Sequence, residues 1–342
     1  MKLSRSPTVS DVARAAGVST ATVSRALNKP ETVRPELRAR VHSAVDRLGY
    51  MAHAGARALS LRRSGTVGVI VPTIDNAIFA RGLHAFQQCM SGAGYVVLLA
   101  FSDYDAGQEE AQALALLARG VDALALTGIS QRPTLRALLE QRGLPWAHVG
   151  TFPAPAGAAC VGFRNREASA RAARYLLDLG HRRVAMLAGI ASENERATER
   201  IEGVREALAE RGLQLAAGDI VQAPYTLQAA REGLRAMLAR KPAPTAVVCG
   251  NDVLAWGALL ECQAQGIAVP TALSVVGFDD LELSRHWRPA LTTVHVPTER
   301  MWALTAGHLL ARLDGRLDAP VQQELEVELV LRASTGRPPR RR

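Results

Sequence analysis

Short β-rich runs alternate with alanine- and leucine-rich helical stretches from Thr66 onward, and this alternation constrains the fold more than any other feature of the 342-residue chain. Strand–helix alternation predicts parallel sheets with helices on both faces. The pattern occurs on either side of about residue 162, which predicts two similar subdomains with a cleft between them. In open parallel sheets, ligands bind beyond the carboxyl ends of the strands. The expected strands are 67–72, 95–100, 122–127, 183–188, 245–249 and 274–278, and the expected helices are 107–119, 166–179, 197–211 and 227–240.

The positive charge of the chain is concentrated at its N-terminal end. Residues 1–64 hold 12 Lys and Arg against 4 Asp and Glu, whereas residues 65–336 carry a net charge of −3. A basic segment of this size favours a phosphate backbone as the partner, although a merely solubilising end would have the same charge. The arginine-rich tail, 337–342, is expected to be disordered, and we assign it no role.

Three short helices are expected in the basic segment. Ser10 or Asp11 can cap the first helix, and Gly17 suits the left-handed turn that ends it. Ser19 can cap the second helix because its hydroxyl can accept a hydrogen bond from a free N–H of the first turn. Each helix has one apolar stripe at i, i+4 spacing. The expected helices cover about 12–16, 20–27 and 35–48.

This order of elements is typical of a helix-turn-helix, in which the second helix enters the major groove of DNA. Hydroxyls and a guanidinium can bond phosphates or bases, and Ala21 can contact a thymine methyl group. A small three-helix bundle without any role on DNA would show the same periodicity. The exposed positions of the second helix are Thr20, Ala21, Thr22, Ser24 and Arg25.

Two adjoining runs, VSDVARAAGVS (9–19) and TATVSRALN (20–28), resemble the LacI/GalR family of bacterial repressors. Pro30, Val33, Arg38, Val41 and the Leu48-Gly49-Tyr50 ending fit the same family. The resemblance implies that residues 1–51 form a DNA-binding headpiece. The residues that it assigns to DNA contact are Thr8, Ser19, Thr20, Ala21, Thr22, Ser24, Arg25 and Asn28.

The family resemblance also implies a hinge helix or linker at 52–65. The family pattern Asn-x-x-Ala-Arg-x-Leu corresponds here to HAGARAL (53–59), which assigns DNA contacts to Arg57 and Leu59. Leu59 would enter the central minor groove, where an apolar wedge unstacks the bases and bends the duplex. Alternatively, Leu59 is a linker residue that packs on the body of the protein. The departures from the pattern are Ala52 in place of proline, His53 in place of asparagine, and Gly55, which disfavours helix by about 0.8–1 kcal/mol relative to alanine.

The resemblance extends to about residue 336 and implies a periplasmic-binding-protein-like core over 66–336. The chain of such a core crosses three times between its subdomains, so the final strand, about 325–331, is expected in the second one. The two expected subdomains are about 66–161 plus 293–324, and 162–292 plus 325–336.

The same alignment implies an effector site. Arg200 lies in the run Arg-Ile-Glu-Gly, Asn251 follows an expected strand, and Asp279 follows Gly-Phe. A fork of donors and a carboxylate can bracket a polyol or a sugar acid. Phe79 and Tyr225 fall near positions that offer aromatic faces. For each of these residues the alternative is a surface ion pair, a helix cap or a place in the core.

The body resembles the gluconate-repressor branch of the family in the runs VGFRN (161–165), ECQ (261–263) and TERM (298–301). Arg164 departs from that branch, because an aspartate is usual there. If Arg164 faces the cleft, a cation at this position would favour a carboxylate-bearing ligand. If it faces solvent, the difference means little.

Motifs of catalysis and cofactor binding are absent from the sequence, which contains no Walker A motif, G-x-G-x-x-G, H-E-x-x-H or G-x-S-x-G. The eight histidines are dispersed without metal-ligand spacing, and the four cysteines are expected to be scattered reduced thiols. We therefore expect no cofactor, no metal and no enzymatic activity. No apolar stretch approaches the roughly 20 residues that span a bilayer, and no signal pattern is visible, so a cytoplasmic location is expected.

These observations predict a homodimeric, ligand-responsive transcriptional repressor. Its partners would be a near-palindromic operator in double-stranded DNA and a carbohydrate or sugar-acid effector, with a gluconate-type acid favoured. Three alternatives remain open at this point: a regulator with a neutral-sugar or purine-type effector, a sugar-binding protein without a DNA function, and an architectural DNA-binding protein whose body only dimerises.

Overall fold

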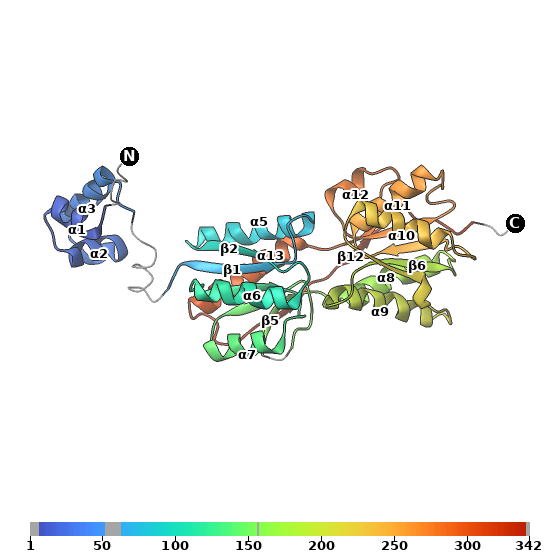
Figure 1. The fold of residues 1–342 in the computed structure, drawn as a ribbon, viewed down its shortest axis with the longest axis horizontal. Coiled ribbons are helices and arrows are strands. Elements are labelled where there is room, and N and C mark those ends of the chain that lie inside the picture. The colour runs from blue at the N-terminus through green and yellow to red at the C-terminus, as the bar shows by residue number, and fades with distance from the viewer. Residues whose placement is uncertain (1–6, 52–62, 156, 340–342) are drawn as a thin grey trace. The chain divides into compact units, whose positions relative to one another are not determined.

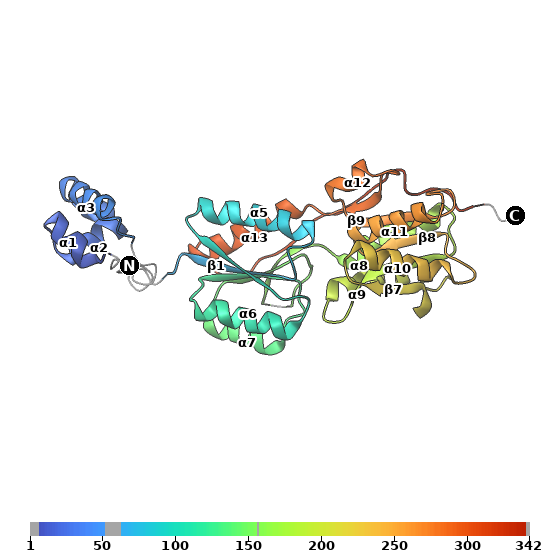
Figure 2. The ribbon, with the colours of Figure 1, turned by 45° about the horizontal axis from the view of Figure 1, so that its top comes forward.

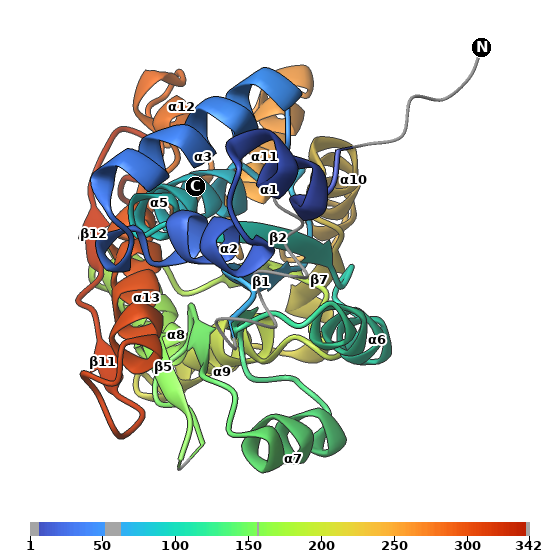
Figure 3. The same cartoon turned by 90° about the vertical axis from the view of Figure 1, so that its left-hand side faces the viewer.

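The computed structural model describes residues 7–51, 63–155 and 157–339, in two compact units, Met1–Gly65 and Thr66–Arg342. The first unit is a bundle of three helices, which Figure 3 shows, with a short 3-10 turn after the second. Gly17 follows the first helix with φ +63°, in the left-handed conformation expected for it. The predicted Ser19 cap is confirmed, since its Oγ accepts from the Thr22 N–H at 3.1 Å. The helices are α1 Val9–Ala16, α2 Thr20–Asn28, η1 Pro30–Thr32 and α3 Pro35–Leu48.

The beginning of α1 corrects one prediction. The cap is Thr8 rather than Ser10 or Asp11: the Thr8 Oγ1 accepts from the Asp11 N–H at 3.3 Å, and the Thr8 N–H donates to Asp11 Oδ2 at 2.9 Å. This reciprocal pair is a capping box, in which two otherwise free donors are satisfied. The core beneath it is made of fully buried valines, one from each helix: Val12, Val23 and Val41. Arg57 and Leu59 lie outside the described residues, as does the rest of 52–62.

The second unit contains two six-stranded sheets, whose orders are β11-β5-β4-β3-β1-β2 and β12-β10-β9-β8-β6-β7. Each of the six predicted strands occurs within one residue or so of its expected bounds. Among the described residues, neighbouring strands pair in parallel except β10 with β12, which are antiparallel. The strands are β1 Thr66–Val71, β2 Val96–Phe101, β3 Ala123–Thr127, β4 Trp146–Val149, β5 Ala159–Gly162, β6 Val184–Gly189, β7 Ile220–Ala223, β8 Ala246–Cys249, β9 Ser274–Asp279, β10 Thr292–His295, β11 Gln322–Glu324 and β12 Glu328–Val330.

Helices cover both faces of each sheet. In Figures 1 and 2, α5 and α13 lie on one face of the first sheet and α6 and α7 on the other. The second sheet is covered by α8 with α9 and by α10 with α11 in the same way. Consequently the strands read as continuous buried runs, as β6 and β9 do over their whole length. The helices are α5 Ala77–Gly92, α6 Ala106–Ala118, α7 Pro133–Arg142, α8 Asn165–Asp178, α9 Glu195–Ala209, α10 Leu227–Leu238, α11 Asp252–Ala264, α12 Glu282–His286 and α13 Thr298–Leu313, with a 3-10 turn η2 at Ala217–Asp219.

The chain passes between the two sheets after β5, after β10 and after β11. The last passage places β12 in the second sheet, where the final strand was predicted. The second passage differs slightly from the expected boundary at residue 293. Because β10 pairs with β9, it belongs to the second subdomain, and the chain returns to the first only at α13.

Candidate functional site

The exposed face of α2 carries the residues that the sequence analysis assigned to DNA. Ser19, Thr20, Ala21 and Arg25 are exposed, whereas Thr22, Ser24 and Asn28 are partly buried. Some of the polar groups also have partners within the helix, since the Asn28 amide donates to Ser24 Oγ at 3.4 Å. The face therefore presents hydroxyls, a small apolar side chain and one guanidinium to solvent.

Two arginines of α3 have a structural role that the sequence analysis missed. Arg40 Nη2 donates to the Ala16 carbonyl at 2.6 Å, and Arg47 Nη2 donates to the Ala15 carbonyl at 3.4 Å. These bonds satisfy carbonyls that the end of α1 leaves without helical partners. A Cβ on Gly17 would lie 2.6 Å from Arg40 Nη2, so this glycine also makes room for the guanidinium.

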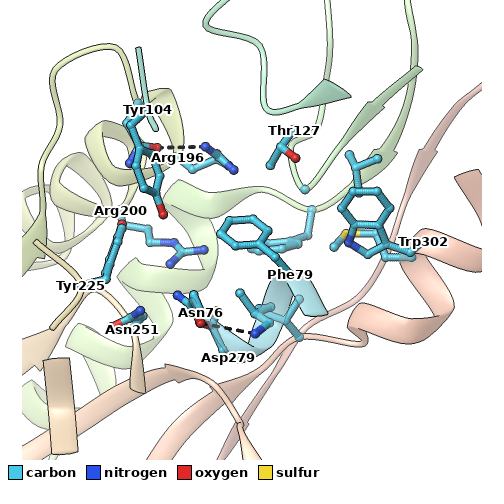
Figure 4. Close-up of a pocket in the computed structure, with 17 residues that line it drawn as sticks. Asn76, Phe79, Tyr104, Thr127, Arg196, Arg200, Tyr225, Asn251, Asp279 and Trp302 are labelled. Carbon is cyan, nitrogen blue, oxygen red and sulfur yellow. Dashed lines mark hydrogen bonds between the residues drawn. The ribbon is translucent and has the colours of Figure 1, made fainter. Parts of the chain in front are cut away.

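A pocket lies between the two subdomains of the second unit, at the carboxyl ends of the parallel strands. It has about 600 Å³ of free space, including its opening to solvent. The residues that line it come at or after the carboxyl ends of β1 to β5 in the first subdomain and of β6 to β10 in the second. Helix α13 adds Trp302 to the lining (Figure 4). The position agrees with the rule that the sequence analysis applied to open parallel sheets. Five of the six predicted effector residues line it: Phe79, Arg200, Tyr225, Asn251 and Asp279.

Arg200 is fixed in the wall by its neighbours. Its Nε donates to Asn165 Oδ1 at 2.9 Å and its Nη1 donates to the Gly250 carbonyl at 2.6 Å. The guanidinium carbon lies 3.7 Å from the centroid of the Phe278 ring, in a cation–π contact. Burial lowers the pKa of Arg200, and the nearby Asp279 opposes this shift.

Asp279 faces the same space from the end of β9. Burial raises its pKa to about 8, and Arg200 acts in the opposite direction. Its Oδ1 is buried without a hydrogen-bond partner among the described residues. The backbone is held at φ +110°, a conformation that L residues rarely adopt and that is often found at functional sites. The carboxyl group therefore has hydrogen-bonding capacity reserved for a ligand.

Asn251 combines a helix cap with a group turned to the pocket. Its Oδ1 accepts from the Leu254 N–H at 2.9 Å and so caps α11. Its Nδ2 is buried and makes no hydrogen bond within the described part of the chain. Asn251 is therefore a helix cap, which was one alternative for this residue, and its Nδ2 is also a free hydrogen-bond donor at the pocket.

Aromatic side chains complete the pocket, and three of them were missed: Tyr104, Phe163 and Trp302. Tyr104 follows β2 and its ring centroid lies 5.7 Å from that of Tyr225. Burial raises the pKa of the Tyr104 hydroxyl, so it stays protonated. Trp302 comes from α13 and packs edge-on against Phe86 at 5.8 Å between centroids. Neither Tyr104 nor Trp302 belongs to a local motif, but Tyr104 could have been found because it follows the carboxyl end of a strand.

Arg196 is a charged pocket residue that was not predicted from the sequence. It lines the pocket one helical turn before Arg200 on α9. The i, i+4 spacing places both arginines on one face of the helix, which is a signal that the sequence contains.

Arg164 lies elsewhere, which corrects the sixth predicted effector residue. It precedes α8, and its side chain is 53% exposed. Its Nε donates to Glu324 Oε1 at 3.0 Å, and its guanidinium carbon lies 5.0 Å from the centroid of Phe152. Because these contacts turn the side chain away from the pocket, the argument for a carboxylate ligand does not hold at this position.

Polar contacts join the subdomains across the pocket. Glu195, at the start of α9, accepts from the Ile129 N–H at 2.9 Å and from Ser130 Oγ at 2.5 Å. Glu193 accepts from the Ala106 N–H at 2.8 Å. All these donors belong to the first subdomain, so the two carboxylates of the second subdomain hold the cleft together.

The described residues contain no group of three or more His, Cys, Asp or Glu that could hold a metal ion. All four cysteines are free thiols. None of the described helices has the length and apolarity that crossing a membrane requires.

Comparison with known proteins agrees with the helix-turn-helix in the first unit and with the pocket-bearing fold of the second unit. Residues 8–52 match the family "Bacterial regulatory proteins, lacI family", and residues 173–335 match the "Periplasmic binding protein-like domain". The HTH-type transcriptional regulator GntR of Pseudomonas aeruginosa is 34% identical over 330 residues, which cover 96% of each protein. The crystal structure of transcription regulator GntR from Chromobacterium violaceum is 36% identical with a TM-score of 0.74, covering 79% of this chain and 99% of that one. The lac repressor dimer bound to operator and an anti-inducer is 25% identical with a TM-score of 0.85, covering 97% of this chain and 100% of that one. The chain therefore belongs to the LacI family of bacterial transcriptional regulators, which are DNA-binding proteins and not enzymes.

Proposed function

We propose that this regulator is a repressor of carbohydrate or sugar-acid metabolism that releases or binds its operator in response to a sugar-acid effector. The observation that carries this proposal is the pairing of an exposed, hydroxyl-rich α2 in one unit with a polar pocket at the strand ends of the other. The protein acts as a homodimer on a near-palindromic operator, in the cytoplasm, where the DNA is.

The DNA contacts follow from the helix-turn-helix. Thr20, Ala21 and Arg25 read base edges from the exposed face of α2, and Ser19 with Thr8 bonds phosphates near the helix starts. Thr22, Ser24 and Asn28 complete this surface. In the hinge, Arg57 and Leu59 contact the minor groove.

This assignment is tested with DNA selected from random duplexes by the purified protein. The selected sites are expected to be near-palindromic, because a symmetric dimer reads two half-sites. Arg25→Ala is expected to weaken binding to the selected duplex by about 10- to 100-fold, the range for loss of one base-reading contact. Arg119→Ala serves as the control, because Arg119 is an exposed arginine of the second unit, away from the helix-turn-helix sequence. If both variants bind the duplex equally well, the assignment of α2 is incorrect.

The effector proposal rests on the charge and donors of the pocket. Among the described residues that line the pocket, the charged groups are the guanidiniums of Arg196 and Arg200 and one carboxyl, Asp279, whose raised pKa of about 8 keeps it largely protonated at neutral pH. Glu195, which lies 3.5 Å from Arg196 Nε, is not part of the lining. The balance is positive, which favours an anion. The neighbouring buried Asn251 Nδ2 and Asp279 Oδ1 can bond hydroxyl groups. A gluconate-type acid, which has one carboxylate and several hydroxyls, fits this set of groups.

The effector is tested by thermal unfolding with gluconate, 2-ketogluconate, 6-phosphogluconate, glucose and ribose. A ligand at about 100 times its dissociation constant adds roughly 2.7 kcal/mol to stability, which shifts the midpoint by several degrees. A shift with an acid but not with glucose or ribose supports the proposal. A larger shift with a neutral sugar assigns the pocket to neutral sugars, whose rings would stack on Tyr104, Tyr225 and Trp302.

Coupling between the two units needs a modest free energy. A difference of about 1–3 kcal/mol between the ligand-bound and ligand-free arrangements changes operator affinity about 5- to 150-fold. The cross-cleft bonds of Glu193 and Glu195 exceed this difference in total, since three hydrogen bonds to charged groups at about 1.5–3 kcal/mol each contribute roughly 4–9 kcal/mol. A ligand that favours or opposes them can therefore switch the protein.

A further inference from the structure

Two arginines, Arg196 and Arg200, reach the pocket from one face of α9, and their surroundings differ (Figure 4). The guanidinium of Arg200 is held by contacts within the protein. Its Nε and Nη1 donate hydrogen bonds to Asn165 and Gly250, and the guanidinium stacks on Phe278, all within the second subdomain. Such a group is held in one orientation and shapes the wall of the pocket.

Arg196 is far less satisfied. Its side chain is only 14% exposed, and among the described residues its one hydrogen bond is long, from Nη2 to Asn194 Oδ1 at 3.3 Å. The buried Nε makes no hydrogen bond in that part of the chain, and the carboxylate oxygen Oε1 of Glu195 lies 3.5 Å from it. A guanidinium has five N–H donors, and leaving buried charged donors without acceptors is costly.

Glu195 makes no hydrogen bond to these donors in the structure. Its two carboxylate oxygens accept instead from the Ile129 N–H and the Ser130 hydroxyl across the cleft. These partners orient Glu195 toward the first subdomain, and its Oε1 stays 3.5 Å from Arg196 Nε. A ligand in the pocket can therefore supply the acceptor that Arg196 lacks.

The side chain of Arg196 also lies against the opposite subdomain. A Cβ on Gly128 would lie 3.0 Å from Arg196 Nε, and one on Gly150 would lie 3.9 Å from its Cδ. Both glycines follow strands of the first sheet and have positive φ angles, +75° and +87°. The guanidinium thus belongs to one subdomain and packs on the other, where a bound anion would touch both.

From this geometry we infer that Arg196 is the residue that selects an anionic effector: its guanidinium binds the carboxylate of the sugar acid, while Arg200, Asn251 and Asp279 bind the hydroxyls. This inference rests on the proposed function. It assigns different roles to the two arginines, with Arg200 shaping the pocket and Arg196 distinguishing an acid from a neutral polyol of the same length.

The test compares D-gluconate with D-glucitol, which replaces the carboxylate by a CH₂OH group and keeps the chain length. Affinities of the full-length protein are measured by titration calorimetry. The wild-type protein is expected to prefer gluconate. In Arg196→Gln, the affinity for gluconate is expected to fall about 10- to 100-fold, the size of a lost charge-assisted pair, while that for glucitol changes less than about threefold. Arg196→Lys keeps the charge without the planar fork and is expected to retain part of the preference.

Arg205→Gln is the matched control, because Arg205 lies on the same helix in an exposed pair with Glu202 and does not line the pocket. It is expected to leave both affinities unchanged. If Arg196→Gln lowers the affinities for gluconate and glucitol equally, Arg196 only supports the structure and the inference is overturned. The inference alone also fails if the variant keeps the wild-type preference. If the wild-type protein binds glucitol as well as gluconate, or binds neither, the sugar-acid effector of the proposed function is overturned together with it.

Discussion

Gly82 in α5 packs directly on Trp302 of α13, and this contact allows a prediction whose sign depends on the tertiary structure. A Cβ built on Gly82 would lie 2.1 Å from both Cδ1 and Nε1 of the indole ring, which is buried beneath the helix. In a helix interior, replacing glycine by alanine normally stabilises by about 0.5–1 kcal/mol. At Gly82, however, the added methyl group would overlap the indole ring of Trp302 unless that ring moved.

The expected cost outweighs the gain. Overpacking a core costs about 1–3 kcal/mol. Because the clash is more than 1 Å inside an ordinary contact and the ring cannot yield as a flexible chain end would, we take the upper half of that range. Gly82→Ala should therefore lower the free energy of unfolding by about 2 kcal/mol after the helical gain is subtracted, or the melting midpoint by about 4–8 °C. Since Trp302 lines the pocket, effector affinity should fall as well.

Gly307→Ala is the matched control, because Gly307 is also helical and nothing lies within 4 Å of the Cβ it would gain. That variant should gain about 0.5–1 kcal/mol. Thermal unfolding of both variants and the wild type is compared at one protein concentration, since dimerisation makes the midpoint concentration-dependent. If Gly82→Ala melts at or above the wild-type midpoint, the packing argument is refuted.

Three further predictions concern polar groups. Burial raises the pKa of Asp279 to about 8 from an ordinary value near 4, so the folded protein keeps a proton that the unfolded chain releases, and stability should fall as the pH rises through this window. Asp279→Asn should remove that part of the pH dependence and exceed wild-type stability by up to about 5 kcal/mol at pH 8 in urea unfolding, since roughly four pKa units correspond to about 1.36 kcal/mol each; parallel pH profiles would contradict it. Asp252→Ala leaves the Leu281 N–H and the Ser284 and Thr293 hydroxyls without their acceptor and should cost about 3–5 kcal/mol in the same assay, whereas Asp252→Asn, which keeps one acceptor oxygen, should cost clearly less. Thr8→Ala should speed hydrogen exchange of the α1 amides by an amount equivalent to about 1 kcal/mol, with Ser10→Ala as an unaffected control, and equal effects would restore the original assignment of the cap.

The sequence determined the elements and their order because these depend on neighbours in the chain. Short, continuous apolar and β-branched runs indicated the strands. Gly17 and Ser19 set the turn of the helix-turn-helix through local backbone preference and hydrogen bonding. The position of the pocket followed as well, since the carboxyl ends of parallel strands lie at one edge. Arg200, Asn251 and Asp279 could be assigned in advance because the sequence resembles the family at these positions.

Only the tertiary structure decided which side chains face that pocket. Arg164 follows the end of β5 as Asn251 follows the end of β8, but Glu324, 160 residues away in the chain, draws Arg164 to the surface. Arg196 gives no motif, and its role depends on lying against Gly128 across the cleft with its Nε unbonded. The direction of a long, flexible side chain is set by partners brought together by folding, and a single sequence contains no record of those distances.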